Sequence, residues 1–201
     1  MAVAALPGPQ QRRDARAERR RRRIADAALA LFAGRGYNAT SVEDLVARAK
    51  VSKSAFYEFF TSKEDCFREL LEQEGGQLIH EVLADAATGH DHHQRLRLGI
   101  TKFVSSSFER SSVARVLIVE SVGLSAGVDR VRQELEGRFA DAVAEEVRHA
   151  MLHDPFYSDK DAEVFGRAVV GAVSDAVGYF LTHPGVDSAS LAQSLCRIFA
   201  P

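Results

Sequence analysis

Residues 40–64 read TSVEDLVARAKVSKSAFYEFFTSKE and contain the patterns of two short helices joined by a tight turn. Thr40 and Glu43 have the spacing of a capping box, in which each side chain binds a backbone N–H of the other residue. The apolar residues that follow recur at helical spacing: Val42, Leu45, Val46 and Ala49. Ser52 can cap the second helix. Its buried side comes from three phenylalanines: Phe56, Phe59 and Phe60.

Helices are also expected on both sides of this stretch. Upstream, a helix runs from residue 18 to the glycines around Arg35, and its apolar residues have helical spacing: Ile24, Ala28, Leu31 and Phe32. Downstream, Thr61 and Glu64 form a second capping box that opens a longer helix toward Ala87. Two short helices joined by a turn and braced by a preceding helix form a helix-turn-helix.

The patterns divide the chain into three parts. Residues 1–17 lack apolar periodicity and are expected to form a flexible basic tail. Residues 18–65 form the helix-turn-helix domain, and residues 66–201 form a larger helical domain. Its later helices are expected at residues 96–110, 113–123, 128–152, 164–181 and 191–199. No alternation of period two occurs, so we expect an all-α protein of about nine helices.

Charge is unevenly distributed along the 201 residues. Residues 1–65 hold 13 basic and 8 acidic residues, a balance of +5, whereas the remainder has a balance of −7. This contrast suggests a module that binds a polyanion, joined to one that does not.

Composition excludes several classes of protein. With 46% apolar and 27% charged residues, most of the chain is neither disordered nor of low complexity. No uncharged apolar run reaches the roughly 18 residues of a membrane span, and basic residues follow the apolar start, unlike in a secretory signal. We expect a cytoplasmic protein without a membrane partner, in which Cys66 and Cys196 are reduced thiols.

Three segments resemble the DNA-binding domain of the TetR (tetracycline-repressor-like) family. They are IADAALALF at residues 24–32, GYNATSVEDL at residues 36–45 and AKVSKSAFYEFFTSKE at residues 49–64. The rest of the chain matches only in helix order and length. The resemblance implies an all-helical homodimer that binds palindromic double-stranded operator DNA as a transcriptional repressor. It also implies release from DNA when a small-molecule effector enters the C-terminal domain.

In a helix-turn-helix, the second short helix presents its N-terminal residues to base edges in the major groove, while flanking groups hold phosphates. Base contacts are expected from Ser52, Lys53, Ser54 and Ala55. The lysine can donate to guanine and the alanine can meet a thymine methyl. Phosphate contacts are expected from Thr40, Ser41, Tyr57 and Lys63, where Tyr57 matches the family's phosphate-binding tyrosine. Alternatively, the hydroxyl residues only cap helices and the lysines are ordinary solvated side chains.

Two positions depart from the family pattern. Position 50 usually holds glycine, because the turn there commonly needs a left-handed backbone, but here it is Lys50. The resulting strain of about 1 kcal/mol is expected to be offset by attraction between the lysine and the DNA backbone. Position 58, often histidine, is Glu58, which either accepts from a cytosine amino group or, as we favour, pairs with a nearby arginine.

The arginine run at residues 19–23 precedes the first apolar residue of the first helix. Arg19 and Arg20 are candidates for contacts with phosphates or with the minor groove, where arginine is favoured. The alternative is a solvated basic tail.

The last two long helices, at about residues 161–199, are the expected dimer interface. Adjacent apolar pairs repeat every four residues from Val164 to Leu181, and Leu191 to Phe199 adds another apolar face. This is more apolar surface than one helix pair needs in a monomer, so a four-helix bundle across a twofold axis is predicted.

The effector pocket is harder to place from sequence. Its candidates are Phe103, Phe108, Glu120, Phe165 and Tyr179. As alternatives, the aromatic residues are ordinary core and the glutamate pairs with Arg115 or another arginine. His90, His92 and His93 lie in an expected loop without a carboxylate or cysteine pattern, so neither a metal site nor a cofactor is predicted.

No catalytic motif is found, since the chain lacks a nucleophile elbow, a phosphate-binding glycine loop, HExxH and CxxC. We therefore do not expect an enzyme. The alternative to a DNA-binding regulator is a membrane-surface or adaptor protein that uses the arginine-rich helix as a basic amphipathic segment. That alternative conflicts with the expectation that the apolar side of this helix is buried within the three-helix domain.

Overall fold

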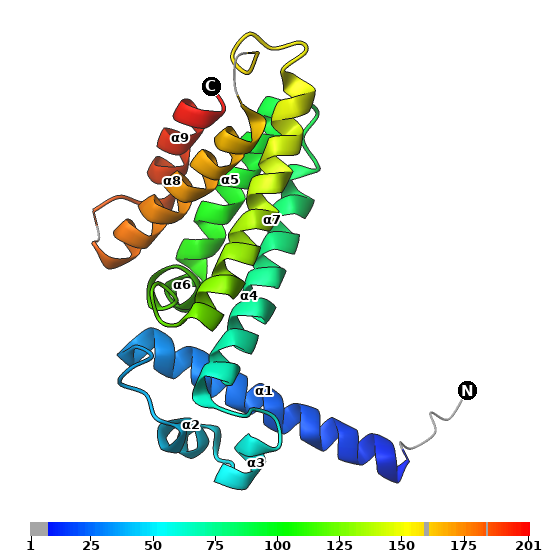
Figure 1. Ribbon diagram of the computed structural model, residues 1–201, viewed down its shortest axis with the longest axis vertical. Helices are drawn as coiled ribbons and strands as arrows, with labels where there is room; N and C mark the ends of the chain where they lie inside the picture. Colours follow the sequence, from blue (N-terminus) through cyan, green and yellow to red (C-terminus); the bar gives the residue numbers. More distant parts are fainter. Residues whose placement is uncertain (1–7, 159–160, 184) are drawn as a thin grey trace. The chain divides into compact units, whose positions relative to one another are not determined.

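The computed structural model describes residues 8–158, 161–183 and 185–201, and every regular element in these ranges is helical (Figure 1). The all-α prediction is confirmed. The chain divides into two compact units, Met1–Leu70 and Leu71–Pro201, whereas the sequence places the boundary after residue 65.

The first unit contains α1 (Pro9–Arg35), α2 (Val42–Ala49), α3 (Lys53–Tyr57) and the start of α4 (Lys63–Ala86). Its core contains the apolar residues expected from the sequence, among them Ile24, Leu45 and Phe56, which are fully buried. The Phe32 ring lies 5.1 Å from that of Phe67 in an edge arrangement, which favours aromatic packing. This core holds α2 and α3 in the helix-turn-helix arrangement.

The first helix begins earlier than predicted. α1 starts at Pro9, so the prediction that residues 9–17 form a tail outside this helix is wrong, and residues 1–7 lie outside the described part of the chain. The Gly8 backbone N–H donates to the Gln11 side chain at 2.8 Å, which satisfies one helix-start group. An exposed helix of glutamine, arginine and alanine needs no apolar periodicity to form.

In both predicted capping boxes, the side chain that accepts the backbone hydrogen bond is the serine one residue after the expected threonine. Ser41, not Thr40, caps α2 and exchanges hydrogen bonds with Asp44. Before α4, the Ser62 hydroxyl accepts from the Asp65 backbone N–H. The Asp65 carboxylate accepts from the Thr61 backbone N–H. Each serine and its aspartate have the same spacing as the threonine and glutamate chosen from the sequence, so spacing alone does not separate the two registers.

The second unit contains the remainder of α4 and the C-terminal helices. These are α5 (His92–Glu109), α6 (Ser111–Ala114), the π-helical segment η1 (Arg115–Glu120), α7 (Ala126–Ala150), α8 (Ala162–Thr182) and α9 (Ser188–Phe199). The helix expected at residues 113–123 is thus an α-helical turn followed by a π-helical one. The core joins α4, α5, α8 and α9 through Val82, Val104, Val177 and Leu195.

Two histidines expected in a loop belong to a helix. Asp91 caps α5 by accepting from the Gln94 backbone N–H at 2.8 Å, so His92 and His93 occupy its first turn. The apolar pattern that marks this helix begins only at Leu96, which explains the late start predicted from the sequence.

Helices α7 and α8 lie side by side, coloured yellow and orange in Figure 1, and approach closely at Gly166. A Cβ atom at this position would lie 2.4 Å from the backbone oxygen of Ala140. By length and composition alone α8 also resembles a membrane span, yet only 22% of its apolar window is buried in the single chain. Most of its apolar stretch is therefore not fully buried by the described residues.

Candidate functional site

The start of α3 presents polar side chains to solvent. Ser52 caps the helix by accepting from the Ala55 backbone N–H at 3.1 Å, and its hydroxyl lies 2.9 Å from that of Ser54. Ser52, Lys53 and Ser54 are exposed, as a base-reading surface requires. Ala55 is only 5% exposed, so its expected contact with a thymine methyl does not fit this structure.

Lys53 forms an ion pair with Glu43 of α2. Its hydrogen bond to Glu43 raises the pKa of the Lys53 ammonium, and the same bond holds the pKa of the Glu43 carboxyl below its ordinary value. The lysine is thus charged, and its hydrogen bond to Glu43 competes with donation to a base. Sequence reasoning missed this partner, although the helix-turn-helix brings α2 and α3 together.

The turn between α2 and α3 confirms the conformation expected at position 50. Lys50 has φ 53° and ψ 48° and is the only non-glycine residue with positive φ in the described ranges. Its carbonyl accepts a hydrogen bond from the Arg23 guanidinium at 2.9 Å. The strained residue is therefore fixed to α1 through its backbone, while its side chain is exposed.

Replacing Lys50 with glycine is expected to raise the free energy of unfolding by about 1 kcal/mol, because glycine adopts positive φ without steric strain. DNA affinity is expected to fall through loss of the charge. Lys50→Ala is the matched control, since it removes the charge but keeps the strain. Chemical denaturation and DNA titration measure the two effects, and unchanged affinity in both variants would refute the proposed role of the charge.

Tyr57 and Glu58 end the short helix with different surroundings. Tyr57 is 50% exposed, as a tyrosine that donates from its hydroxyl to a phosphate would be. Glu58 pairs with Arg20 of α1 at 3.2 Å, which confirms the arginine pairing favoured from the sequence. Arg20 also lies over the Phe59 ring, 5.8 Å from its centre, so this candidate already has partners within the domain.

Thr40 and Lys63 are directed inward instead of toward solvent. Thr40 is buried and its hydroxyl donates to the Gly36 carbonyl at 2.8 Å. The Lys63 ammonium donates to the carbonyls of Tyr37 and Thr40 at 2.9 and 2.8 Å, and burial lowers its pKa. These contacts fix the loop before α2, so the structure gives both residues an internal role in place of the expected phosphate contact.

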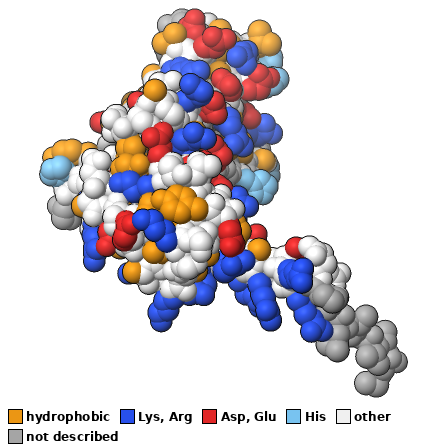
Figure 2. Space-filling model, turned by 60° about the horizontal axis from the view of Figure 1, so that its bottom comes forward, with side chains coloured by type: hydrophobic (Ala, Val, Ile, Leu, Met, Phe, Trp, Pro, Cys, Tyr) orange, Lys and Arg blue, Asp and Glu red, His pale blue; other side chains and the backbone are white. Residues whose placement is uncertain are grey.

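Ser41 and Arg19 remain at the surface. Ser41 is exposed, although its hydroxyl donates to Asp44 at 2.6 Å. Arg19 is exposed on α1, and Figure 2 shows Lys and Arg side chains gathered along the stretch of α1 that leads to the N-terminal residues. Two other arginines of the run are bound within the domain: Arg21 to Glu69 and Arg23 to Lys50.

The second unit contains an apolar cavity of about 260 Å³ between α4, α5, α7 and α8. Its apolar lining includes Leu96, Ile100, Phe103, Val143, Val169 and Val173. Arg95 and Glu146 also line it and form an ion pair at 3.2 Å. Sequence reasoning missed this pair, because no local pattern connects two residues on different helices.

The expected effector residues do not form one group. Phe103 lines the cavity and also a wider hollow of about 610 Å³, which Tyr179 lines as well. The other three line neither of these two spaces. Phe108 packs against the core, Phe165 packs against the Tyr157 ring at 5.5 Å, and Glu120 pairs with Arg115 at 3.7 Å. For these three, the structure supports the alternatives given above.

Comparison with known proteins supports the interpretation of the first unit as a helix-turn-helix domain. Residues 24–70 match the family model described as bacterial regulatory proteins, tetR family. The chain is 33% identical over 86 residues to the transcriptional activator FasR of Mycolicibacterium smegmatis, which covers 43% of this chain and 39% of FasR. It is 27% identical to the transcriptional repressor KstR of Mycobacterium tuberculosis, covering 72% of this chain and 67% of KstR. Matches to the first curated relatives span less than half of their lengths, 39% and 45%.

Solved structures share the whole fold. The regulator FadR of Bacillus subtilis, solved in complex with stearoyl-CoA, superposes with a TM-score of 0.81 at 19% identity and covers 89% of this chain and 97% of its own. At this identity the likeness shows the fold. The helix-turn-helix domain at residues 24–70 is therefore a domain of the tetR family of bacterial regulatory proteins.

Proposed function

We propose that this protein is a cytoplasmic, DNA-binding transcriptional regulator that represses genes as a homodimer on a palindromic operator. The observation that carries the proposal is the start of α3, where Ser52, Lys53 and Ser54 are exposed and Tyr57 follows at the other end of the helix. A recognition helix reads bases with its first residues, while groups beside it hold phosphates. The proposal assigns no catalytic step to the chain.

The membrane-surface alternative does not fit the structure. It requires the arginine-rich helix to expose an apolar side to lipid. In α1 that side is buried in the core of the first unit, where Ile24, Leu31 and Phe32 are at most 6% exposed.

Replacing Tyr57 with phenylalanine is expected to weaken operator binding about fivefold, because one hydrogen bond to a phosphate contributes about 1 kcal/mol. The preferred DNA sequence is expected to stay the same, since phosphates carry no direct sequence information. A changed sequence preference in Tyr57→Phe would refute the assignment of Tyr57 to a phosphate.

The dimer is proposed to form through α8 and α9. The exposed side of α8 carries small and apolar residues at helical spacing: Val164, Ala168, Gly171, Ala172 and Tyr179. Ile198 is a large apolar residue exposed on α9. Small residues allow close approach of another helix, and a twofold axis would cover both faces at once. Sedimentation at micromolar concentration is expected to show a dimer, and a monomer would contradict this part of the proposal.

The effector is proposed to be a small molecule with an extended apolar part, such as a fatty-acyl group. Support comes from the apolar lining of the cavity in the second unit and from the stearoyl-CoA bound to the FadR structure. A ligand that binds the folded state raises its stability. Stearoyl-CoA is therefore expected to raise the melting temperature and to release DNA, whereas neither effect would occur if the cavity is only a packing defect.

A further inference from the structure

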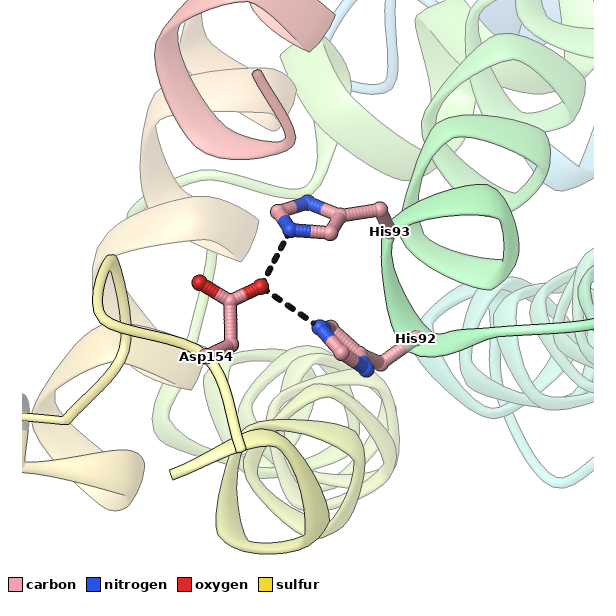
Figure 3. Close-up of side chains that lie close together, drawn as sticks. All are labelled: His92, His93 and Asp154. Carbon is pink, nitrogen blue, oxygen red and sulfur yellow. Dashed lines mark hydrogen bonds and ion pairs between the residues drawn. The ribbon is translucent and has the colours of Figure 1, made fainter. Parts of the chain in front are cut away.

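Two imidazoles and a carboxylate converge outside the surfaces described above (Figure 3). His92 and His93 lie in the first turn of α5, and Asp154 follows α7. The Nε2 atom of His92 is 2.8 Å from Oδ2 of Asp154, and His93 Nε2 contacts the same oxygen. The three candidate ligand atoms all lie within 4.8 Å of one another. No sequence pattern indicated a carboxylate beside the histidines, because Asp154 lies about 60 residues away along the chain.

Neighbouring groups hold the three side chains in place. The second oxygen of Asp154 accepts from the Phe156 backbone N–H at 2.9 Å, which orients Oδ2 toward the imidazoles. Tyr157 is completely buried and packs against both imidazole rings, with ring centres 5.6 and 5.3 Å away. The Tyr157 hydroxyl donates to the Phe199 carbonyl at 3.1 Å. The cluster therefore packs against a buried tyrosine on one side and keeps partial access to solvent, since 13–29% of each of its side chains is exposed.

We propose that His92, His93 and Asp154 form a binding site for a divalent first-row transition ion, with Zn²⁺ as the expected occupant. Two imidazole nitrogens and one carboxylate oxygen are a ligand set that Zn²⁺ takes in proteins, with water in the remaining position. Mg²⁺ and Ca²⁺ prefer oxygen ligands and would bind poorly to two imidazoles.

The second shell of this site is incomplete. Coordination through Nε2 places the imidazole proton on Nδ1, and the buried Nδ1 of His93 has no hydrogen-bond partner within the described part of the chain. Loss of such a partner typically lowers metal affinity about 10–100-fold. A micromolar dissociation constant is therefore expected, weaker than that of a closed structural zinc site.

Metal binding here would connect two segments of the second unit. The ion would join the start of α5 to the loop after α7. Arg95 and Leu96, which line the apolar cavity, lie two and three residues after His93 in α5. The inference does not depend on DNA binding or on the effector, because it concerns only the stability of the second unit and its affinity for the ion.

The test is titration of the untagged full chain with Zn²⁺, after treatment with EDTA and dialysis, using a chromophoric chelator as competitor. One Zn²⁺ per chain is expected, together with a higher melting temperature that Mg²⁺ does not produce. His93→Gln and Asp154→Asn should each lower the affinity at least about tenfold, while the exposed control His80→Gln should leave it unchanged.

Circular dichroism of the metal-free variants establishes that they are folded. X-ray absorption at the zinc edge provides a second measurement and is expected to show two imidazole ligands. Binding by the unmodified chain weaker than about 1 mM, near the weak end of specific association, would overturn the proposal. So would retention of full affinity in both folded variants.

Discussion

Replacing Gly166 with alanine is expected to lower the free energy of unfolding by about 3 kcal/mol, the upper end for overpacking a tight interior. The added Cβ would lie 2.4 Å from the Ala140 carbonyl oxygen and 3.2 Å from the Ala144 backbone nitrogen. These are backbone atoms of α7, so no flexible side chain can move aside. The two helices would have to separate, and the packing between α7 and α8 would be lost along the contact.

Gly137→Ala is the matched control for this prediction. Gly137 lies on α7, and a Cβ there would meet only the end of the Arg167 side chain at 3.8 Å, an ordinary contact. Alanine favours helix over glycine by about 1 kcal/mol, so this variant is expected to be slightly more stable. Denaturant unfolding followed by circular dichroism measures both changes. Similar stability of the two variants would contradict the close approach at Gly166.

Replacing Lys53 with alanine is expected to weaken operator binding about 10–100-fold, the effect of losing one specific base contact of about 1–3 kcal/mol. Lys53 is the first residue of α3 and is exposed at the end that a recognition helix presents to the major groove. The preference for one base pair in each half-site is expected to relax. Full retention of sequence preference would show that Lys53 contacts a phosphate or nothing.

Glu43→Gln provides the opposite test of the same contact. The ion pair with Glu43 competes with DNA for Lys53, so removing the carboxylate charge is expected to raise operator affinity a few-fold without changing the preferred sequence. Lys102→Ala, in α5 of the second unit, is a control for the loss of one positive charge. Fluorescence anisotropy at fixed salt measures all three variants, because phosphate attraction varies steeply with ionic strength.

Helices were predicted correctly where a local pattern of residues determines the structure. The apolar spacing of residues 42–49 and the three phenylalanines after Ser52 predicted α2 and α3. The left-handed turn at Lys50 was expected from the family pattern, in which this position usually holds glycine. The start of α1 was missed because an exposed polar helix has no apolar period. Its beginning depends on propensity and on the Gly8–Gln11 contact, which are weaker signals.

Contacts between segments that are far apart in the chain could not be predicted from the sequence. Thr40 and Lys63 look like surface phosphate ligands in a one-dimensional pattern, yet the fold directs the Lys63 ammonium to the Tyr37 and Thr40 carbonyls. Asp154 meets the two histidines only because α5 and α7 pack together. Such partners are set by tertiary packing, and no periodicity in a single sequence specifies them.

The most direct test of sequence-specific DNA binding is selection of bound duplexes from a random-sequence pool at roughly physiological salt, where nonspecific phosphate attraction is weakened. The protein is expected to enrich an inverted repeat, with two half-sites read by the α3 helices of a dimer. Recovery of duplexes without any enriched motif, from a sample shown to be folded and dimeric, would contradict the proposed function and leave a domain that binds polyanions without reading sequence.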